Sequence, residues 1–293
     1  MQWTTDWGLR LRMAVTMFLL FALYLIFAGF IVAYMGGGMA MFLLLMGGFS
    51  IGQWYFSDRL TLWSMGAREV TESEYPDLHR SVRRLSQQAD LPMPKVAVVD
   101  SEMPNAFATG RSKNHAAVAV TTGIMRSLDQ EELEGVLAHE LSHIKNRDMT
   151  VMTVASFLST VAFIVVRWGW LFAGGRNRQQ GGAPVIVAIV ASLVVWIISY
   201  LLIRALSRYR EYAADRGAAM ITGKPAALAS ALLKIDNRMD RVPDEDLREQ
   251  AEMNAFFIIP IDRGIIARLF STHPSTENRV ERLRDMEQQV ETA

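Results

Sequence analysis

Two histidines and a glutamate stand at a spacing that could hold and use a metal ion. His139-Glu140-Leu141-Ser142-His143 lie in a stretch whose composition favours an α-helix. Four residues make about one helical turn, so both imidazole rings would project from the same face. Two neutral ring nitrogens at that spacing can bind one Zn²⁺, and Glu140 beside them could accept a proton from water. The pattern predicts a hydrolytic zinc site; the alternative is a helix that carries two surface histidines.

A catalytic zinc site needs a third protein ligand, which this chain restricts to a carboxylate or another histidine because it has no cysteine. Glu211 is the best candidate, since it follows an apolar run that predicts a continuing helix, with Asp215 one turn further on the same face. Glu211 could ligate the metal while Asp215 accepts the free N–H of a zinc-binding histidine. In the alternative, both are solvated charges paired with Arg208 and Arg216. The residues alone leave these two interpretations equally open.

The elements that must position these residues are predicted from local patterns. Residues 75–89 predict a helix that ends at the prolines of Leu91-Pro92-Met93-Pro94. Apolar runs at 95–99 and 115–120 predict strands. Ser127 and Gln130 fit a capping box that would begin the helix carrying the histidines.

Long uncharged runs predict membrane helices. The chain has 293 residues, 51% of them hydrophobic, and its mean hydropathy is +0.16. Residues 13–57 include no charged residue or histidine, a length that suits two spans joined at Gly36-Gly37-Gly38 and exceeds the apolar core of a signal peptide. Two further runs cover 149–166 and 181–203. We predict four transmembrane helices in two hairpins, at 13–34, 39–56, 149–171 and 184–206.

Basic residues predict the orientation of these spans. The residues on the expected cytoplasmic flanks are Arg10, Arg12, Arg59, Arg68, Lys145, Arg147, Arg204, Arg208 and Arg210. Arg176 and Arg178, in the second hairpin loop, oppose the trend. We therefore expect both termini and the polar segments in the cytoplasm.

The same patterns divide the chain into four parts. The first hairpin is 1–57 and the second is 149–206. Residues 58–148 carry the zinc-binding helix and 207–293 carry the third ligand, so we expect these two segments to fold as one catalytic domain. The formal net charge is zero, which disfavours a nucleic-acid partner.

Several motifs together resemble the HtpX family of bacterial membrane zinc metalloproteases, which are related to the CAAX prenyl proteases of eukaryotes. The motifs are Asn105-Ala106-Phe107-Ala108, His139-Glu140-x-x-His143 followed by Asp148, Arg208-x-x-Glu211-x-x-x-Asp215, and Ser271-Thr272-His273-Pro274-Ser275-Thr276-x-x-Arg279. The resemblance covers essentially the whole chain. It implies that His139, His143 and Glu211 bind one zinc ion per chain, and that Glu140 is the catalytic base.

The resemblance also implies a fold, a location and a role. The expected fold class is an α-helical membrane protein with an α+β zincin-like catalytic domain of the gluzincin type. The expected activity is a zinc metalloendopeptidase that cleaves unfolded or damaged membrane proteins, as part of protein quality control and the stress response. The protein would be a multi-pass protein of the bacterial inner membrane with a cytoplasmic catalytic domain. Its partners would be polypeptide substrates, the lipid bilayer, and membrane proteases or chaperones.

Other residues have weaker signals. Asn105, Ala106, Phe107 and Ala108 could form an edge strand that pairs with an extended substrate, or an ordinary turn and strand. His273 and Arg279 could stabilise an oxyanion, or close the domain structurally. His79 and His115, which lack a partner pattern, are expected to be surface or core residues.

Two other classes of protein share part of this pattern. A membrane scaffold or chaperone could bind zinc without catalysis, but a structural site would need no carboxylate at Glu140 and would close its fourth position. A transporter is disfavoured because transport paths usually include ionisable groups within the spans, and these runs have none.

Overall fold

The structure, a computed structural model, describes residues 7–35, 54–153, 183–239 and 273–291, with Ile258 and scattered positions at 44–52 and 155–163. The glycine turn at 36–38, the loop arginines 176 and 178 and about half of the residues in the predicted second and third spans lie outside the described residues. The chain forms two compact units. One includes Phe56–Thr150 and Ser207–Ala293, and the other includes Asp6–Tyr55 and Val151–Leu206.

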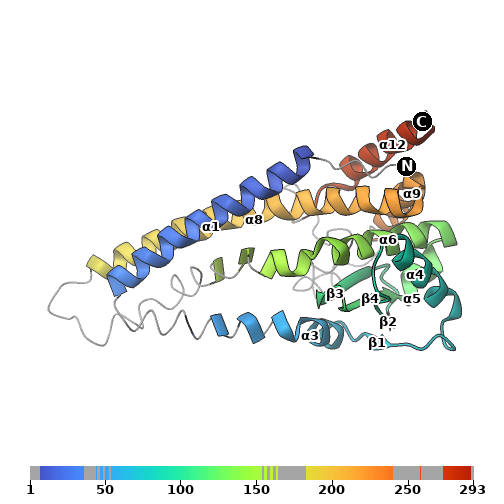
Figure 1. The fold of residues 1–293 in the computed structure, drawn as a ribbon, viewed down its shortest axis with the longest axis horizontal. Helices are drawn as coiled ribbons and strands as arrows, with labels where there is room; N and C mark the ends of the chain where they lie inside the picture. The colour runs from blue at the N-terminus through green and yellow to red at the C-terminus, as the bar shows by residue number, and fades with distance from the viewer. Residues whose placement is uncertain are drawn as a thin grey trace. The chain divides into compact units, whose positions relative to one another are not determined.

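A four-stranded sheet lies at the centre of the first unit (Figure 1). Its strands are β1 (Arg68–Glu69), β2 (Lys95–Val99), β3 (Ala106–Ser112) and β4 (His115–Thr121), in the order β1-β2-β4-β3. β2 and β4 are parallel, whereas β1 and β3 pair antiparallel to their neighbours. The strands predicted at 95–99 and 115–120 are confirmed, and the run after Asn105 becomes an edge strand.

The sheet is buried on both faces, because alternate residues enter different clusters. In β2, Val96 and Val98 join the main core, while Ala97 and Val99 join a smaller cluster that includes Leu62. Leu62 lies on α3 (Ser57–Ser64), so this short helix packs against the second face.

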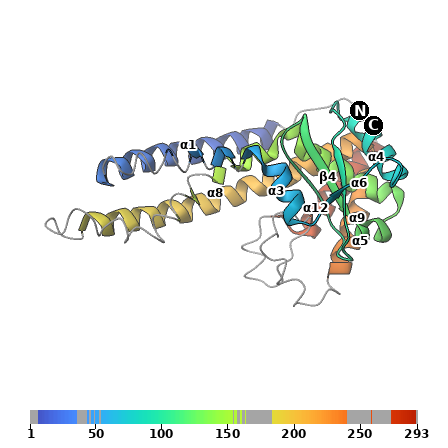
Figure 2. The ribbon, with the colours of Figure 1, turned by 90° about the horizontal axis from the view of Figure 1, so that it is seen from below.

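Helices cover the main-core face in successive layers. They are α4 (Pro76–Gln88), α5 (Thr122–Ser127), α6 (Gln130–Asn146), α9 (Pro225–Met239) and α12 (Thr276–Glu291). α4 and α6 pack together, α6 also contacts β3, and α9 lies between α6 and α12 (Figure 1). Figure 2 shows α3 on the opposite side of the sheet from α4 and α6. The helix predicted at 75–89 is confirmed as α4.

Helix α6 begins with a capping box, but not at the predicted residues. Asp129 is the N-cap: its side chain accepts the N–H of Glu132, and the Glu132 carboxylate accepts the N–H of Asp129. Ser127 instead ends α5, where its hydroxyl donates to the carbonyl of Gly123. The prediction of Ser127 and Gln130 was wrong because Asp and Glu fit the same motif two residues later.

The second unit contains α1 (Trp7–Met35) and the first part of α8 (Ala183–Thr222). Leu20 and Tyr24 of α1 pack with Ala155 and Leu206, and the Tyr24 hydroxyl donates to the carbonyl of Ala155. Within the described residues, one helical stretch, Ile189–Thr222, is long and apolar enough to cross a membrane. From Ser207 onward, α8 belongs to the first unit.

Candidate metal centre

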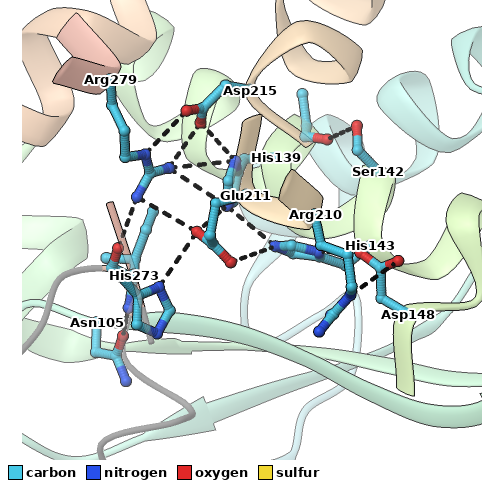
Figure 3. Close-up of polar contacts among 12 residues, drawn as sticks. Asn105, His139, Ser142, His143, Asp148, Arg210, Glu211, Asp215, His273 and Arg279 are labelled. Carbon is cyan, nitrogen blue, oxygen red and sulfur yellow. Dashed lines mark hydrogen bonds and ion pairs between the residues drawn. The ribbon is translucent and has the colours of Figure 1, made fainter. Parts of the chain in front are cut away.

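Three donor side chains from two helices converge in the first unit (Figure 3). His139 and His143 lie one turn apart on α6, and their Nε2 atoms are 3.1 Å apart. Glu211 reaches them from α8, with Oε2 3.6 Å from His139 Nε2 and Oε1 3.5 Å from His143 Nε2. The predicted ligand set is therefore assembled.

The spacing of these donors fits zinc. Four ligands at about 2.0–2.1 Å from a tetrahedral zinc lie about 3.3–3.4 Å from one another. The three donor–donor separations of 3.1, 3.5 and 3.6 Å bracket that value. Oε2 of Glu211 is buried and makes no well-aligned hydrogen bond among the described residues, although His273 Nδ1 lies 3.3 Å away and Arg279 Nη1 lies 3.5 Å away; a cation would satisfy it. Two histidines and one carboxylate also make a three-ligand set that leaves a fourth position open.

Each histidine contacts a buried aspartate. His139 Nδ1 lies 3.0 Å from Asp215 Oδ1, which confirms the predicted proximity of these residues. His143 Nδ1 lies 2.6 Å from Asp148 Oδ2. Donation of the Nδ1–H to a carboxylate fixes the tautomer and leaves Nε2 as the metal donor on both rings.

Each aspartate in turn has an arginine. Arg279 donates to both oxygens of Asp215, from Nε at 2.9 Å and from Nη2 at 2.7 Å. Arg210 Nε lies 3.1 Å from Asp148 Oδ1. Figure 3 shows Arg279 on one side of the histidines and Arg210 on the other.

The charges within this cluster shift the pKa values of its members. Burial raises the pKa of Glu211, but the charge of His273 and hydrogen bonds from the histidines outweigh it, so the pKa lies well below its usual value. Burial lowers the pKa of His139, but hydrogen bonds to Asp215 and Glu211 raise it to about 9. These carboxylates therefore create a site that favours positive charge.

Glu140 lies on the same helix as the histidines and is buried. Burial raises the pKa of its carboxyl group, while the nearby His139 and His143 act in the opposite direction. The backbone N–H of Ala108, in β3, donates a hydrogen bond to it. Glu140 thus lies beside the edge strand and near the metal donors.

The pairing of β3 shows which of its backbone groups face away from β4. In an antiparallel pair, successive residues alternate between bonding to the partner strand and pointing away from it. The carbonyl of Asn105 accepts the N–H of Thr121, so the alternation directs Asn105 and Phe107 toward β4, and Ala106 and Ala108 toward the open edge. The Ala108 bond to Glu140 agrees with this assignment.

Asn105 and Arg279 also hold one peptide unit. The N–H of Ile258 donates to Asn105 Oδ1 at 3.1 Å, and its carbonyl accepts from Arg279 Nη1 at 2.8 Å. The side chain of Asn105 is therefore engaged within the protein. Most N–H groups of Arg279 are likewise used by Asp215 and Ile258.

His273 also lies at the centre, with Nδ1 3.3 Å from Glu211 Oε2. The other two histidines lie elsewhere: His79 bonds to the carbonyl of Val70, and His115 bonds to Ser112. The structure thus brings His273 into the site and leaves His79 and His115 outside it, as predicted.

Close helix packing brings α8 to the histidines. Gly217 faces Ser142 of α6, and a Cβ at position 217 would lie 2.4 Å from Ser142 Oγ and 2.8 Å from its Cβ. Both distances are shorter than real Cβ atoms adopt. A glycine at this crossing therefore allows the approach that Glu211 needs.

Asp148 and Arg210 were not assigned to the site from the sequence. In the sequence, Asp148 is only a member of the motif that carries the family resemblance, and Arg210 is only a basic residue that flanks a predicted membrane span. The available signal was an acidic residue five positions after His143, but its use depends on the turn between them. Arg147 adopts a left-handed conformation with φ 57°, which ends α6 and turns the chain at Asp148.

Comparisons with known proteins agree with this site. Residues 72–287 match the family model of peptidase family M48. "Protease HtpX homolog 2" of Methanosarcina mazei is 56% identical over 99% of each chain, and "Protease HtpX homolog" of Moorella thermoacetica is 55% identical over 98% of this chain and 97% of its own. Because relatives occur in Methanosarcina, an archaeal genus, as well as in bacteria, a bacterial source stays a prediction.

A solved structure supports the fold. The crystal structure of S. mikatae Ste24p superimposes with a TM-score of 0.57 at 17% identity, over 89% of this chain and 62% of that chain. The family match, the whole-length relatives and the assembled donor set lead to one assignment: this chain belongs to peptidase family M48 and is a zinc metalloprotease of the HtpX type, a homologue of membrane proteases with at least one helix suited to crossing a membrane.

Proposed function

We propose that this protein is a multi-pass membrane endopeptidase that cleaves unfolded or damaged segments of membrane proteins at the cytoplasmic face. The observation that carries the proposal is the position of Glu140, which accepts a hydrogen bond from Ala108 of the edge strand β3 and lies near enough to His139 and His143 for their charges to lower its pKa. A purely structural zinc site would need no buried carboxylate there.

Substrate binding is proposed to use the edge of β3. Ala106 directs its backbone groups toward that edge and Ala108 directs its carbonyl there, since the Ala108 N–H bonds to Glu140, so an extended peptide could pair with them as an added strand. This mode of binding recognises backbone rather than a particular side chain. It therefore favours unfolded or loosely structured polypeptides, because folded chains already use their backbone groups.

The chemistry is proposed to follow from the groups around the histidines. Zinc, when bound to His139, His143 and Glu211, supplies a Lewis acid that polarises a carbonyl and makes water more acidic. Glu140 then removes the proton of the attacking water and returns it to the leaving amine.

His273 is proposed to stabilise the developing oxyanion. Arg279, the other candidate from the sequence, is better suited to positioning Asp215, because its N–H groups are already used there and at Ile258. Asp215 is buried and contacts His139, so Asp215 is proposed to orient that ring and Arg279 to hold Asp215 in place.

Membrane location is proposed to select the substrates. Four predicted spans would hold the catalytic residues close to the bilayer, since Glu211 follows Ile203 by eight residues, or about 12 Å of helix. A site at that distance would meet the loops and frayed ends of membrane proteins before most soluble chains.

One experiment tests the proposal. A reporter segment is fused to a membrane span or supplied as a soluble peptide, and its cleavage by the full chain is measured in proteoliposomes with and without chelation. We expect faster cleavage of the tethered reporter, and no cleavage of either by Glu140→Gln, which should still bind zinc. Equal cleavage of both reporters would contradict the membrane preference, and near-normal turnover by zinc-loaded Glu140→Gln would contradict the role of the base.

A further inference from the structure

The two zinc-binding histidines are each supported by a separate pair of buried charges. His139 contacts Asp215, which Arg279 holds; the second series begins at His143, which contacts Asp148. Asp148 is 1% exposed and lies beside Arg210, which is 8% exposed. A carboxylate removed from water to this extent is costly unless a countercharge lies beside it.

Asp148 reaches His143 through a specific backbone turn. α6 ends at Asn146, and the left-handed Arg147 turns the chain, so that the Asp148 carboxylate points back to the helix. The contact with His143 Nδ1 is 2.6 Å, shorter than the 3.0 Å between His139 and Asp215. This carboxylate therefore sets the direction of the His143 ring.

Arg210 connects this arrangement to the third zinc ligand. It precedes Glu211 on α8, so a single helix supplies both the third donor and the charge that neutralises Asp148. Four residues later, the same helix supplies Asp215, which orients the other histidine. The position of α8 thus affects all three metal donors, Glu211 directly and the two histidines through Asp148 and Asp215.

We propose that Asp148 and Arg210 are positioning residues for His143, with Arg210 acting through Asp148. They orient the ring so that its Nε2 and Glu211 meet the metal together. The proposal rests on the zinc-dependent function proposed above and extends it to two residues outside the ligand set. If the ion pair only stabilised the fold, loss of either side chain would leave the zinc affinity of the folded protein unchanged. A positioning pair should lower that affinity when either side chain is removed.

The test measures metal binding by the full-length protein in detergent, with zinc buffered by a competing chelator. Asp148→Ala should weaken zinc affinity about 10–100-fold, the range for residues that orient a ligand. Arg210→Gln should also weaken it, by no more than Asp148→Ala does. In the double variant, Arg210→Gln should add no further loss, because its partner is already absent.

Matched variants separate positioning from general damage. Arg208→Gln removes an exposed arginine from the same helix turn and should leave the affinity unchanged. Asp148→Asn retains an acceptor for His143 and should recover much of the affinity if Asp148→Ala loses it. With Co²⁺ in place of zinc, the visible absorption bands of Asp148→Ala and Arg210→Gln should shift relative to the unmodified protein and to Arg208→Gln.

Several results would overturn the proposal. Unchanged zinc affinity and an unchanged cobalt spectrum in Arg210→Gln would show that this arginine does not position the ligand. Additive losses in the double variant would show that Arg210 acts independently of Asp148. If Asp148→Ala does not fold, Asp148→Asn and Arg210→Gln still decide the question. Failure of the unmodified, zinc-loaded protein to cleave peptides would contradict the proposed function alone, since these readouts concern the metal.

Discussion

At the scale of single residues, the centre consists of charges that are buried together. Arg279 and Asp215 are each 1% exposed and form two hydrogen bonds with each other. Removing one member of such a pair leaves the other charged and without compensation, which costs about 3–5 kcal/mol in buried pairs. Substitutions here therefore change stability as well as metal binding, and the two effects must be measured separately.

Glu211 and Asp215 should differ sharply in their effect on zinc. Glu211→Ala leaves two protein donors and should lose most of the bound metal, whereas Asp215→Ala should weaken affinity by about 10–100-fold. Zinc content and affinity of the purified, folded variants check this. Tight stoichiometric zinc in Glu211→Ala would mean that the third donor lies elsewhere, with His273, 3.3 Å from Glu211, the next residue to test.

Some residues of the site could be predicted because helix geometry alone relates them. His139 and His143 are one turn apart, as are Glu211 and Asp215, so each pair shares a face whatever the rest of the chain does. The link between Asp148 and Arg210 could not be predicted in this way. It requires a left-handed arginine at position 147, where glycine is the usual residue, and a contact between two distant segments.

At the scale of elements, the site depends on how closely α8 approaches α6. Gly217→Ala should push the helices apart, because the new Cβ would lie 2.4 Å from Ser142 Oγ. Overpacking costs about 1–3 kcal/mol, offset in part by the roughly 1 kcal/mol that alanine contributes in a helix. We expect a lower thermal midpoint and weaker zinc binding, both measured on the detergent-purified protein.

The partner residue provides the control for this substitution. Ser142→Gly removes both atoms that the new Cβ would meet, so the double variant should recover zinc affinity relative to Gly217→Ala. If the double variant binds zinc no better than Gly217→Ala, the close contact does not set the position of Glu211.

The start of α6 should be sensitive to pH through its N-cap. Asp129→Ala removes the acceptor for the Glu132 N–H and should cost about 1 kcal/mol at pH 7, whereas Asp129→Asn should cost much less. The hydrogen bond from that N–H lowers the pKa of Asp129 below its usual 3.8. The contribution of the Asp129 carboxylate to the free energy of unfolding is therefore complete above pH 3.8. It is lost as the pH falls through the lower pKa of the folded state.

Thermal midpoints of the three proteins across this range provide the measurement. The difference between Asp129→Ala and the unmodified protein should be constant from pH 7 to about 5 and should shrink in more acidic buffer. A difference that grows on acidification would contradict the assigned cap.

Local patterns predicted the elements better than their ends. The strands 95–99 and 115–120 and the helix 75–89 could be predicted because apolar runs and helical signals agree with burial there. The start of α6 was misplaced by two residues, since serine and aspartate are both good caps and only the folded chain selects between them. The edge position of β3 depends on strand order, which cannot be predicted from a local sequence pattern.

At the scale of the whole molecule, the orientation in the membrane is open to a direct test. The chain has no cysteine, so a thiol reagent would label only a cysteine introduced at a chosen exposed position. Gln88→Cys on α4 and Asn114→Cys between β3 and β4 should react with an impermeant thiol reagent in inverted vesicles but not in intact cells. Labelling from outside the cell would reverse the predicted orientation.

The number of membrane spans could be inferred only from uncharged runs. One described stretch, Ile189–Thr222, meets the criterion of length and hydropathy, and about half of the residues in two other predicted spans lie outside the described residues. The substrates likewise follow from no single residue, because an edge strand binds backbone and carries little side-chain selectivity.

The order of the donors along the chain has a consequence for biosynthesis. The ribosome completes His143 68 residues before it reaches Glu211, and the predicted second hairpin lies between them. Until that hairpin has been translated, a nascent chain carries two of the three donors and lacks Arg210 and Asp215 as well. The protein therefore cannot hold its metal in a complete site while it is still being inserted, so proteolysis must wait until α8 has folded back onto α6.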